Sequence, residues 1–242
     1  MRNNRRQMLR AMKKIICLAI ACIIFLSLAS CKDNDRAEAE RKVAEYRAAK
    51  FTQYAEENEK YADYEVDVAF IGDSLTDGYD LEKYYPQYVV SNRGIGGETT
   101  TGLEERLQLS IFELKPKVVV MLIGANNMDS MLQNYERLIT SIKENLPDSR
   151  LIILSLTSMG DEWGRKNQLA AYNNVQLKLL AEKHSLEFVD LYSPLLNLED
   201  GEIYDEYTTD GGHLTHEGYV VLTEQITPAI ERQLAIWHEA SK

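Results

Sequence analysis

Cysteine is scarce in this sequence, and its three positions are informative. Cys17, Cys22 and Cys31 all lie within the first 31 of 242 residues. The rest of the chain therefore offers no disulfide, no thiolate nucleophile and no cysteine-ligated metal site. Long hydrophobic runs are also lacking. The uncharged run over residues 15–30 is shorter than the ~20 residues that a membrane-spanning helix needs.

A basic segment precedes this uncharged run. Residues 1–14 carry six basic side chains and no acidic one, which is the layout of a secretory signal peptide. The run ends in Leu-Ala-Ser-Cys at positions 28–31, which resembles the bacterial lipobox, where the cysteine is acylated and becomes the first residue. We therefore expect a lipoprotein signal peptide over residues 1–30 and a lipidated Cys31. A plain signal peptide or an uncleaved anchor is the alternative.

Basic residues are few in the remaining chain. Without residues 1–30 it has 21 basic and 38 acidic residues, a net charge of −17. This charge argues against binding to nucleic acid and against adsorption to anionic lipid head groups. We expect attachment to the membrane through lipid on Cys31, in a bacterial cell envelope, at the periplasmic face or the outer surface. The acidic stretch 32–35 resembles outer-surface signals of some lipoproteins, or is a solvated tether.

Residues 35–64 are rich in alanine and in charge, with aromatic side chains that include Tyr46, Phe51, Tyr54 and Tyr61. This pattern predicts a charged helix with a narrow apolar stripe, and a disordered linker is the alternative. We assign residues 31–64 to a tether that spaces the following domain from the membrane and packs its aromatic residues on that domain.

Strand and helix patterns alternate through the rest of the chain. Buried strands are expected at residues 66–71, 88–91, 117–123, 151–156 and 186–190. Helices are expected at residues 100–114, 131–146, 167–184 and from 215 onward, the last kinked or interrupted at Pro228. This alternation predicts a single α/β domain over residues 65–242, with a five-stranded parallel sheet covered by helices on both faces.

A polar turn follows the first expected strand. Gly72 ends that strand, and Ser74 comes two residues later. In an open α/β sheet, ligands bind at the carboxyl ends of the strands. Ser74 is therefore a candidate nucleophile, although Asp-Ser after a strand is also an ordinary turn composition.

Loops after the second and third strands should share that edge. Residues 92–99 include Gly94, Gly96 and Gly97, whose N–H groups can approach a ligand or form a tight turn. The next loop offers Asn126, whose carboxamide can polarise an ester carbonyl or cap the following helix.

The loop before the last helix contains Asp210 and His213. An aspartate three residues before a histidine, across two glycines, can accept the imidazole Nδ1–H and leave Nε2 as a base. We interpret the other three histidines, His184, His216 and His238, as structural.

Together these four blocks resemble the SGNH, or GDSL-type, esterase/lipase superfamily, from about residue 66 to about residue 233. Residues 93–99 look closest to platelet-activating-factor acetylhydrolase-like and lysophospholipase-like enzymes. The resemblance implies a flavodoxin-like three-layer fold and ester hydrolysis without a metal or another cofactor. Asn127 stands where many relatives have aspartate, and we expect little effect because the implied donor is Asn126. The implied site consists of a Ser74, Asp210 and His213 triad with Ser74, Gly97 and Asn126 as oxyanion-hole donors.

These observations predict a serine esterase acting on acyl or acetyl esters of glycans or lysophospholipids in the envelope. The acidic loop 197–207 disfavours anionic acyl donors if it lines the entrance, and is otherwise a solvated loop. One alternative is a non-catalytic carbohydrate-binding lipoprotein that uses the same cleft. Another is a metal-dependent phosphoesterase with Asp73, Asp210 and His213 as ligands.

Overall fold

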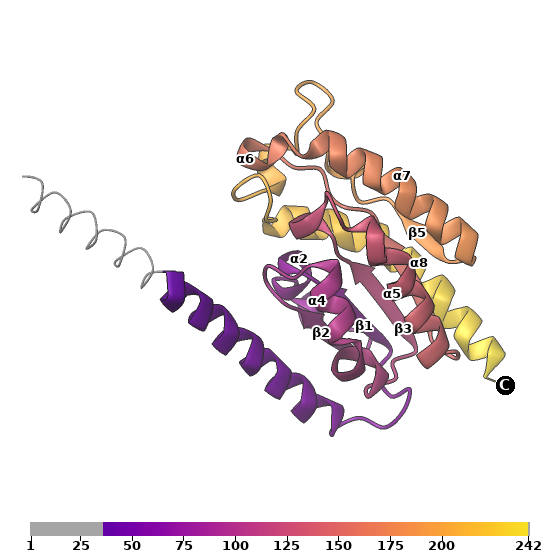
Figure 1. The fold of residues 1–242 in the computed structure, drawn as a ribbon. Helices are drawn as coiled ribbons and strands as arrows, with labels where there is room; N and C mark the ends of the chain where they lie inside the picture. Colours follow the sequence, from indigo (N-terminus) through magenta and orange to yellow (C-terminus); the bar gives the residue numbers. More distant parts are fainter. Residues whose placement is uncertain (1–35, 242) are drawn as a thin grey trace, which may run out of the picture. The chain divides into compact units, whose positions relative to one another are not determined.

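The computed structural model describes residues 36–241 of the chain (Figure 1). The predicted signal peptide over residues 1–30 and the lipidation candidate Cys31 lie outside the described residues. Within residues 36–241, no helix combines the length and the apolar character needed to cross a membrane.

The chain divides after Lys50 into two units, of which the structure describes residues 36–50 and 51–241. A helix over residues 36–58 begins in the first unit and ends in the second. In the first unit its charged side chains pair four residues apart, as in the 2.8 Å contact between Arg36 and Glu40. This is the charged helix that the sequence predicts, although it ends before residue 64.

The second unit is built on a five-stranded parallel sheet. Its strands are β1 (Val68–Gly72), β2 (Val90–Gly94), β3 (Val118–Leu122), β4 (Arg150–Leu154) and β5 (Glu187–Val189). The strand order β2-β1-β3-β4-β5 is the flavodoxin-like order. The predicted α/β fold is confirmed.

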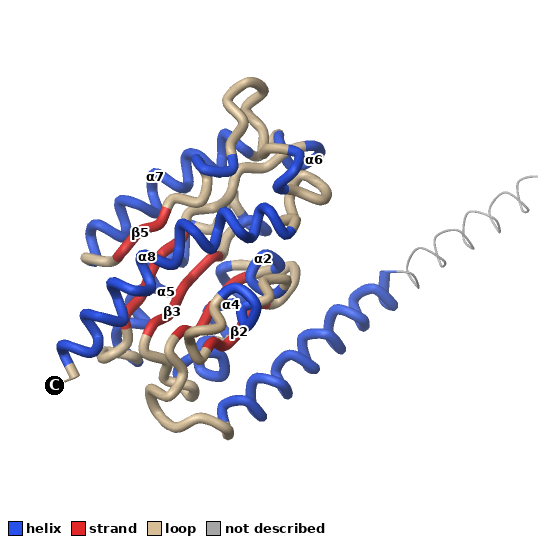
Figure 2. The backbone as a smooth tube through the Cα atoms, turned by 180° about the vertical axis from the view of Figure 1, so that it is seen from behind, coloured by secondary structure: helices blue, strands red, loops and turns tan. Residues whose placement is uncertain are grey.

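Helices cover both faces of this sheet. They are α2 (Ser74–Asp77), α3 (Leu81–Tyr84), α4 (Thr100–Glu105), α5 (Leu132–Asn145), α6 (Asp161–Gly164), α7 (Asn167–His184) and α8 (His216–Ala240). Shorter turns are η1 (Gln108–Phe112), η2 (Ala125–Asn127), η3 (Ser193–Leu195) and η4 (Asp205–Tyr207). Figures 1 and 2, which view the molecule from opposite sides, show α8 across one face and α5 with α7 across the other.

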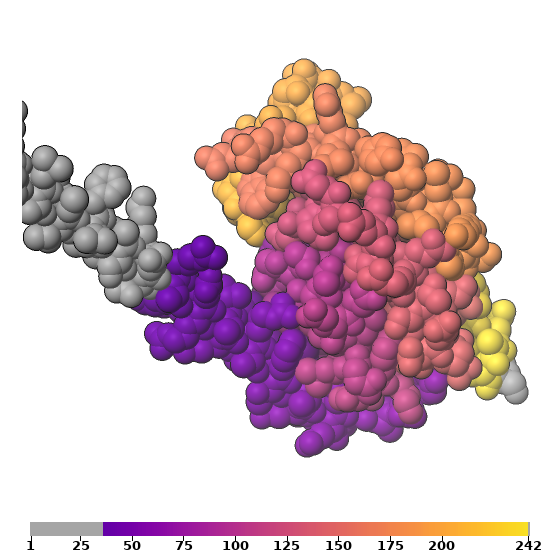
Figure 3. Space-filling model, in the orientation of Figure 1, coloured from indigo at the N-terminus to yellow at the C-terminus, as the bar shows by residue number. Residues whose placement is uncertain are grey.

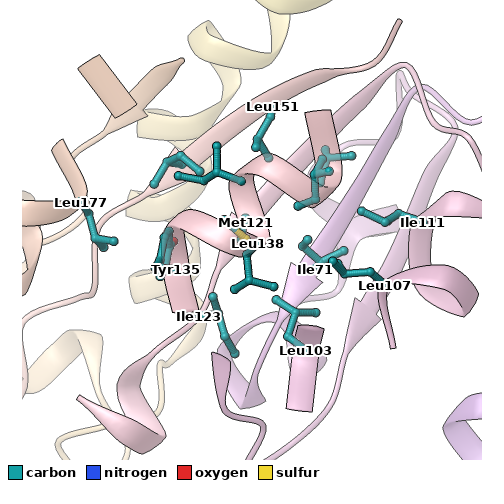
Figure 4. Packing of buried hydrophobic residues seen from close by; sticks show 14 of the residues in the cluster. Ile71, Leu103, Leu107, Ile111, Met121, Ile123, Tyr135, Leu138, Leu151 and Leu177 are labelled. Atoms are coloured by element: carbon teal, nitrogen blue, oxygen red, sulfur yellow. The ribbon is translucent and has the colours of Figure 1, made fainter. Parts of the chain in front are cut away.

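Successive strand residues point into two separate hydrophobic clusters, one on each face. In β1, Ala69 and Ile71 belong to the cluster formed with α4, α5 and α7, whereas Val68 and Phe70 belong to the cluster formed with α2, α3 and α8. Figure 4 shows part of the first cluster, including Ile71 and Met121 of adjacent strands. Each large side chain buried in this way stabilises the fold by about 1.5–3 kcal/mol. The two clusters therefore hold the strand ends in fixed positions.

The helix expected over residues 100–114 is interrupted in the structure. α4 ends at Glu105, and the π-helical turn η1 follows. Leu103, Leu107 and Ile111 are all buried, so apolar residues recur at helical spacing on both sides of the interruption. The sequence pattern therefore gave no sign of the interruption.

Pro228, where the sequence predicts a kink or an interruption, does not interrupt the last helix. α8 runs continuously from His216 to Ala240 with Pro228 inside it. Ile226 and Ala229, on either side of the proline, are buried in the cluster on that face of the sheet. This packing offsets the loss of one main-chain hydrogen bond at the proline.

Candidate active site

Ser74 is the first residue of α2 and follows β1 by one residue. The residue between them, Asp73, caps α2 because its Oδ1 accepts the N–H of Leu75 at 3.1 Å. Gly72 has no room for a side chain, since a Cβ there would lie 2.1 Å from the carbonyl oxygen of Leu122. The tight turn from strand to helix therefore fixes Ser74 at the carboxyl end of the sheet.

His213 contacts Ser74 from the loop that precedes α8. Its Nε2 lies 3.1 Å from the Ser74 Oγ, and its Nδ1 lies 2.8 Å from Oδ2 of Asp210. The other carboxylate oxygen, Oδ1, accepts the main-chain N–H groups of His213 at 2.7 Å and of Gly212 at 3.0 Å. Asp210 and His213 thus form one hydrogen-bonded series with Ser74, which is 139 residues away from His213 in the sequence.

The carboxylate of Asp210 is ionised at neutral pH. The hydrogen bond from the His213 side chain, together with the main-chain N–H groups, lowers the pKa of Asp210 to about 2. An ionised carboxylate accepts the proton on Nδ1, and we assign the imidazole tautomer on that basis. The lone pair of Nε2 then faces the Ser74 hydroxyl, which allows the imidazole to remove its proton.

The turn that carries His213 depends on a glycine. Gly211 has a φ of +80°, and a Cβ there would lie 2.1 Å from the carbonyl oxygen of Gly160. The N–H of Gly160 donates to the carbonyl oxygen of Gly211 at 2.8 Å. This close approach of two main chains packs the turn against the segment that follows β4.

The two other expected oxyanion-hole donors come from the loops after β2 and β3. Gly97 has a φ of +75°, and a Cβ there would meet nothing within 4 Å, so its main chain is open to solvent or substrate. Asn126 lies in η2, and its Nδ2 donates to the main-chain oxygen of Glu98 at 2.9 Å. That hydrogen bond uses one N–H of the planar carboxamide and fixes the direction of the other.

A single cavity brings these loops together. Its volume is about 310 Å³, and it is lined by Ser74, Gly97, Asn126 and His213. Asp210 lies behind the imidazole and does not line the cavity. The structure therefore places all five predicted site residues at one location, at the carboxyl edge of the sheet.

The segment after β4 also lines this cavity, and the four predicted loops did not include it. Met159 and Trp163 contribute apolar surface, and the Trp163 ring stands edge-on to the His213 ring with centroids 6.5 Å apart. The carboxyl end of β4 lies at the same edge as those of its neighbours. Topology and the tryptophan between two glycines were therefore a usable signal in the sequence.

The acidic loop over residues 197–207 lies outside the cavity. Leu198 in this loop is 86% exposed, and the space-filling view shows the orange segment around it projecting from the surface (Figure 3). Glu202 Oε2 accepts the N–H of Asp161 at 3.0 Å, at the start of α6. The loop thus contacts the helix that carries Trp163 without lining the cavity itself.

Asp73 differs from Asp210 in its surroundings. Its residue exposure is 1%, and this burial raises its pKa to about 7 despite the hydrogen bond from Leu75 and the nearby His213. Among residues 36–241, no three His, Cys, Asp or Glu side chains are grouped so that they could hold a metal ion. Asp73, Asp210 and His213 therefore do not form the ligand set that the phosphoesterase alternative requires.

The remaining histidines contact side chains elsewhere, and none of them lines the cavity. The three contacts are His184 with Glu136, His216 with Tyr84, and His238 with Trp237.

Known proteins are similar to this chain in sequence and in fold. The model of the GDSL-like lipase/acylhydrolase family matches residues 70–221. The platelet-activating factor acetylhydrolase IB subunit alpha2 of Rattus norvegicus is 30% identical over 183 residues, which cover 71% of this chain and 79% of that protein. The corresponding subunit alpha1 of Pongo abelii is 28% identical over 186 residues, covering 72% and 79%.

A solved structure agrees with these sequence relatives. The GDSL-like lipase from Bacteroides thetaiotaomicron VPI-5482 is 26% identical, with a TM-score of 0.67, and the similarity covers 75% of this chain and 97% of that one. The family match includes every loop that lines the cavity. The chain therefore belongs to the GDSL-like lipase/acylhydrolase family and is a carboxylic ester hydrolase.

Proposed function

We propose that this ester hydrolase is a serine esterase in which Ser74, His213 and Asp210 act as a catalytic triad. The observation that carries the proposal is the series of contacts from Asp210 Oδ2 through the imidazole to Ser74 Oγ, at 2.8 and 3.1 Å. A nucleophile within hydrogen-bond reach of a base, with that base oriented by a third group, is the arrangement that activates a hydroxyl. The non-catalytic carbohydrate-binding alternative is set aside because the chain is an ester hydrolase.

The first half of the reaction forms an acyl-enzyme. Nε2 of His213 takes the Ser74 proton as Oγ bonds to the ester carbonyl carbon, whose oxygen becomes an oxyanion. The N–H groups of Ser74 and Gly97 and the Asn126 carboxamide donate to that oxyanion. The carbon–oxygen bond to the alcohol then breaks, and the leaving alcohol takes the proton from His213.

The second half releases the acid. A water molecule gives a proton to His213 Nε2 as its oxygen attacks the acyl carbon, and the same donors hold the second oxyanion. The bond to Ser74 Oγ then breaks, and the imidazolium returns its proton to the serine. Throughout, the ionised Asp210 keeps the ring oriented and stabilises its positive charge.

We propose a short acyl group, such as acetyl, carried on a glycan or a lysophospholipid-like alcohol. The cavity of about 310 Å³ lies at the lower end of the range for small-molecule sites, which favours a short acyl chain. Two relatives bear the name acetylhydrolase, in agreement with that size. No cofactor takes part in this scheme.

Replacement of the nucleophile tests this function. Wild-type protein and the Ser74→Ala variant would be compared on p-nitrophenyl acetate and octanoate, and for covalent labelling by a fluorophosphonate probe. We expect labelling and hydrolysis by the wild type only, with kcat/KM higher for acetate than for octanoate. Undiminished hydrolysis by Ser74→Ala would exclude the triad, and a preference for octanoate would exclude the short acyl group.

We further propose that the enzyme is anchored in a bacterial cell envelope through lipid on Cys31. Support comes from the sequence alone: a basic segment, an uncharged run and the lipobox-like residues 28–31. Labelled palmitate fed to expressing cells should enter the wild-type protein and not the Cys31→Ser variant, and only the wild type should sediment with membranes. Equal labelling of both proteins would exclude this anchor.

A further inference from the structure

A buried ion pair includes Glu98, the residue next to the cavity-lining Gly97. Nε of Arg106 donates to Oε2 of Glu98 at 2.9 Å, and each of the two side chains is only 2% exposed. Removing two charges from water is costly, and a buried pair is on average little or no more stabilising than apolar side chains of similar size. The position of this pair therefore calls for an explanation other than stability.

The guanidinium of Arg106 joins the ends of the two strands that carry the nucleophile and the glycine-rich loop. Its Nη2 donates to the carbonyl oxygen of Gly72, the last residue of β1, at 2.9 Å. Its Nη1 donates to the carbonyl oxygen of Arg93 in β2, also at 2.9 Å, and to Ser110 Oγ at 2.8 Å. One planar group thus holds the main chain two residues before Ser74.

Glu98 extends this connection to the oxyanion-hole donors. It is the residue after Gly97, and its Oε1 accepts the N–H of Thr99 at 3.2 Å. Its main-chain oxygen accepts the Nδ2 of Asn126 at 2.9 Å. The residue that Arg106 holds therefore follows one proposed donor in the chain and orients another through a hydrogen bond.

We propose that Arg106 and Glu98 are positioning residues that set the oxyanion-hole donors of Gly97 and Asn126 against Ser74. The proposal rests on the proposed function, since it presumes that these groups bind an oxyanion. Donors stabilise developing charge only when they are held in place before the reaction. A displacement of about 1 Å can lower the rate by ~10²-fold.

Lysine cannot replace Arg106 in this role. The three nitrogens of the planar guanidinium donate to four acceptors, which are one carboxylate, two main-chain oxygens and one hydroxyl. An ammonium group is a compact charge on a flexible stem and does not reproduce that fork. The charge can be kept while the geometry is lost, which separates positioning from electrostatics.

The test compares Arg106→Lys and Glu98→Gln with wild type on p-nitrophenyl acetate, below the unfolding temperature of every protein. We expect kcat to fall about 10- to 100-fold in both variants, with KM changed less than about twofold. Fluorophosphonate labelling of Ser74 should persist but be slower. When either variant is combined with Asn126→Ala, kcat should fall by less than the product of the two single fold-decreases. Both changes act on the same donor, so their effects are not independent.

A matched control is the partly buried ion pair at the opposite edge of the sheet. Lys117 Nζ lies 2.6 Å from Asp67 Oδ1, at the amino ends of β1 and β3. Asp67→Asn should lower the unfolding temperature without lowering kcat. Wild-type kcat in Arg106→Lys and Glu98→Gln, or an equal loss of kcat in Asp67→Asn, would overturn the positioning role. An active, unlabelled Ser74→Ala variant would instead overturn the proposed function.

Discussion

Two aspartates beside the nucleophile have opposite electrostatic environments. Asp210 is half exposed and accepts hydrogen bonds from His213 and from the main chain, which lowers its pKa to about 2. Asp73 is almost fully buried, which raises its pKa to about 7. Residues of one type therefore differ in charge near neutral pH because of burial and hydrogen bonding.

The raised pKa of Asp73 predicts how stability depends on pH. Because the folded-state pKa of about 7 lies above the ordinary aspartate value of 3.8, the favourable contribution of this residue is complete below pH ~4 and is lost as pH rises to 7. The slope approaches 1.4 kcal/mol per pH unit for one proton. Asparagine does not titrate and keeps an oxygen for the N–H of Leu75. The free energy of unfolding of Asp73→Asn, relative to wild type, should therefore rise between pH 5 and 7.5.

Urea titrations at several pH values would measure this difference, with Glu104→Gln as the control. Hydrogen bonds from Arg137 and Asn134 lower the pKa of Glu104, which confines its pH-dependent contribution to stability to acidic pH. The stability of Glu104→Gln relative to wild type should therefore be constant between pH 5 and 7.5. A constant difference for Asp73→Asn as well would show that the buried carboxyl does not titrate in that range.

The proposed role of Asn126 in the oxyanion hole predicts a change in kcat. Loss of one oxyanion-hole donor lowers turnover by ~10²–10³-fold, so Asn126→Ala should lower kcat by that factor. KM should change little, because the ground-state ester carbonyl gains less from the donor than the oxyanion does. Asn145→Ala, at an exposed position in α5, is the control and should retain wild-type kinetics. An unchanged kcat in Asn126→Ala would remove this residue from the oxyanion hole.

α2, the helix that begins at Ser74, packs directly against the main chain of β2. A Cβ on Gly94 would lie 2.2 Å from the main-chain nitrogen of Asp77, the last residue of α2. Asn92, two residues earlier, donates through Nδ2 to the carbonyl oxygen of Thr76 at 2.7 Å. The position of the nucleophile thus depends on direct contact between a short helix and a neighbouring strand.

Gly94→Ala should therefore displace α2 and damage both stability and activity. Overpacking typically costs about 1–3 kcal/mol, and because main-chain atoms are in the way we expect a loss near the upper end of this range. Gly78→Ala is the matched control, since its Cβ would lie 3.0 Å from the hydroxyl of Tyr219 and 3.4 Å from the nearest main-chain atom. Urea unfolding and kcat/KM on p-nitrophenyl acetate would be measured for both. Equal effects of the two substitutions would refute this account of the Gly94 contact.

Elements with a strong period were predictable, and those shaped by distant contacts were not. α5 occupies Leu132–Asn145, within one residue of the expected 131–146 at each end, because its buried side chains recur at helical spacing. α4 ends early, at the point where Arg106 binds the carbonyl oxygens of Gly72 and Arg93. Contacts of this kind join residues that no local pattern relates. The loops carrying Ser74, Asn126 and His213 were predictable because topology alone places them at one edge.

On the scale of the whole molecule, the end of the long N-terminal helix is part of the hydrolase unit, which begins at Phe51. The Tyr54 side chain is fully buried, its hydroxyl donates to the carbonyl oxygen of Gly94 at 2.6 Å, and the Arg93 guanidinium lies 4.8 Å from its ring centre. Glu57 also contacts Arg93, at 3.4 Å. β2 is an edge strand, so these residues cover an edge that would otherwise be open. The sequence alone did not distinguish Tyr54 from the other aromatic residues of the same charged helix.

This packing predicts different effects for a large deletion and a single substitution. Removal of residues 1–50 leaves the contacts of Tyr54 intact, and esterase activity and the urea midpoint should remain near wild-type values. In the full chain, Tyr54→Ala should lower the free energy of unfolding by ~3–5 kcal/mol, as expected when a large buried ring is lost. Tyr54→Phe keeps the ring and loses one hydrogen bond, so its cost should be closer to ~1 kcal/mol. If the deletion destabilised the enzyme more than Tyr54→Ala does, residues before Phe51 would also have to support the sheet edge.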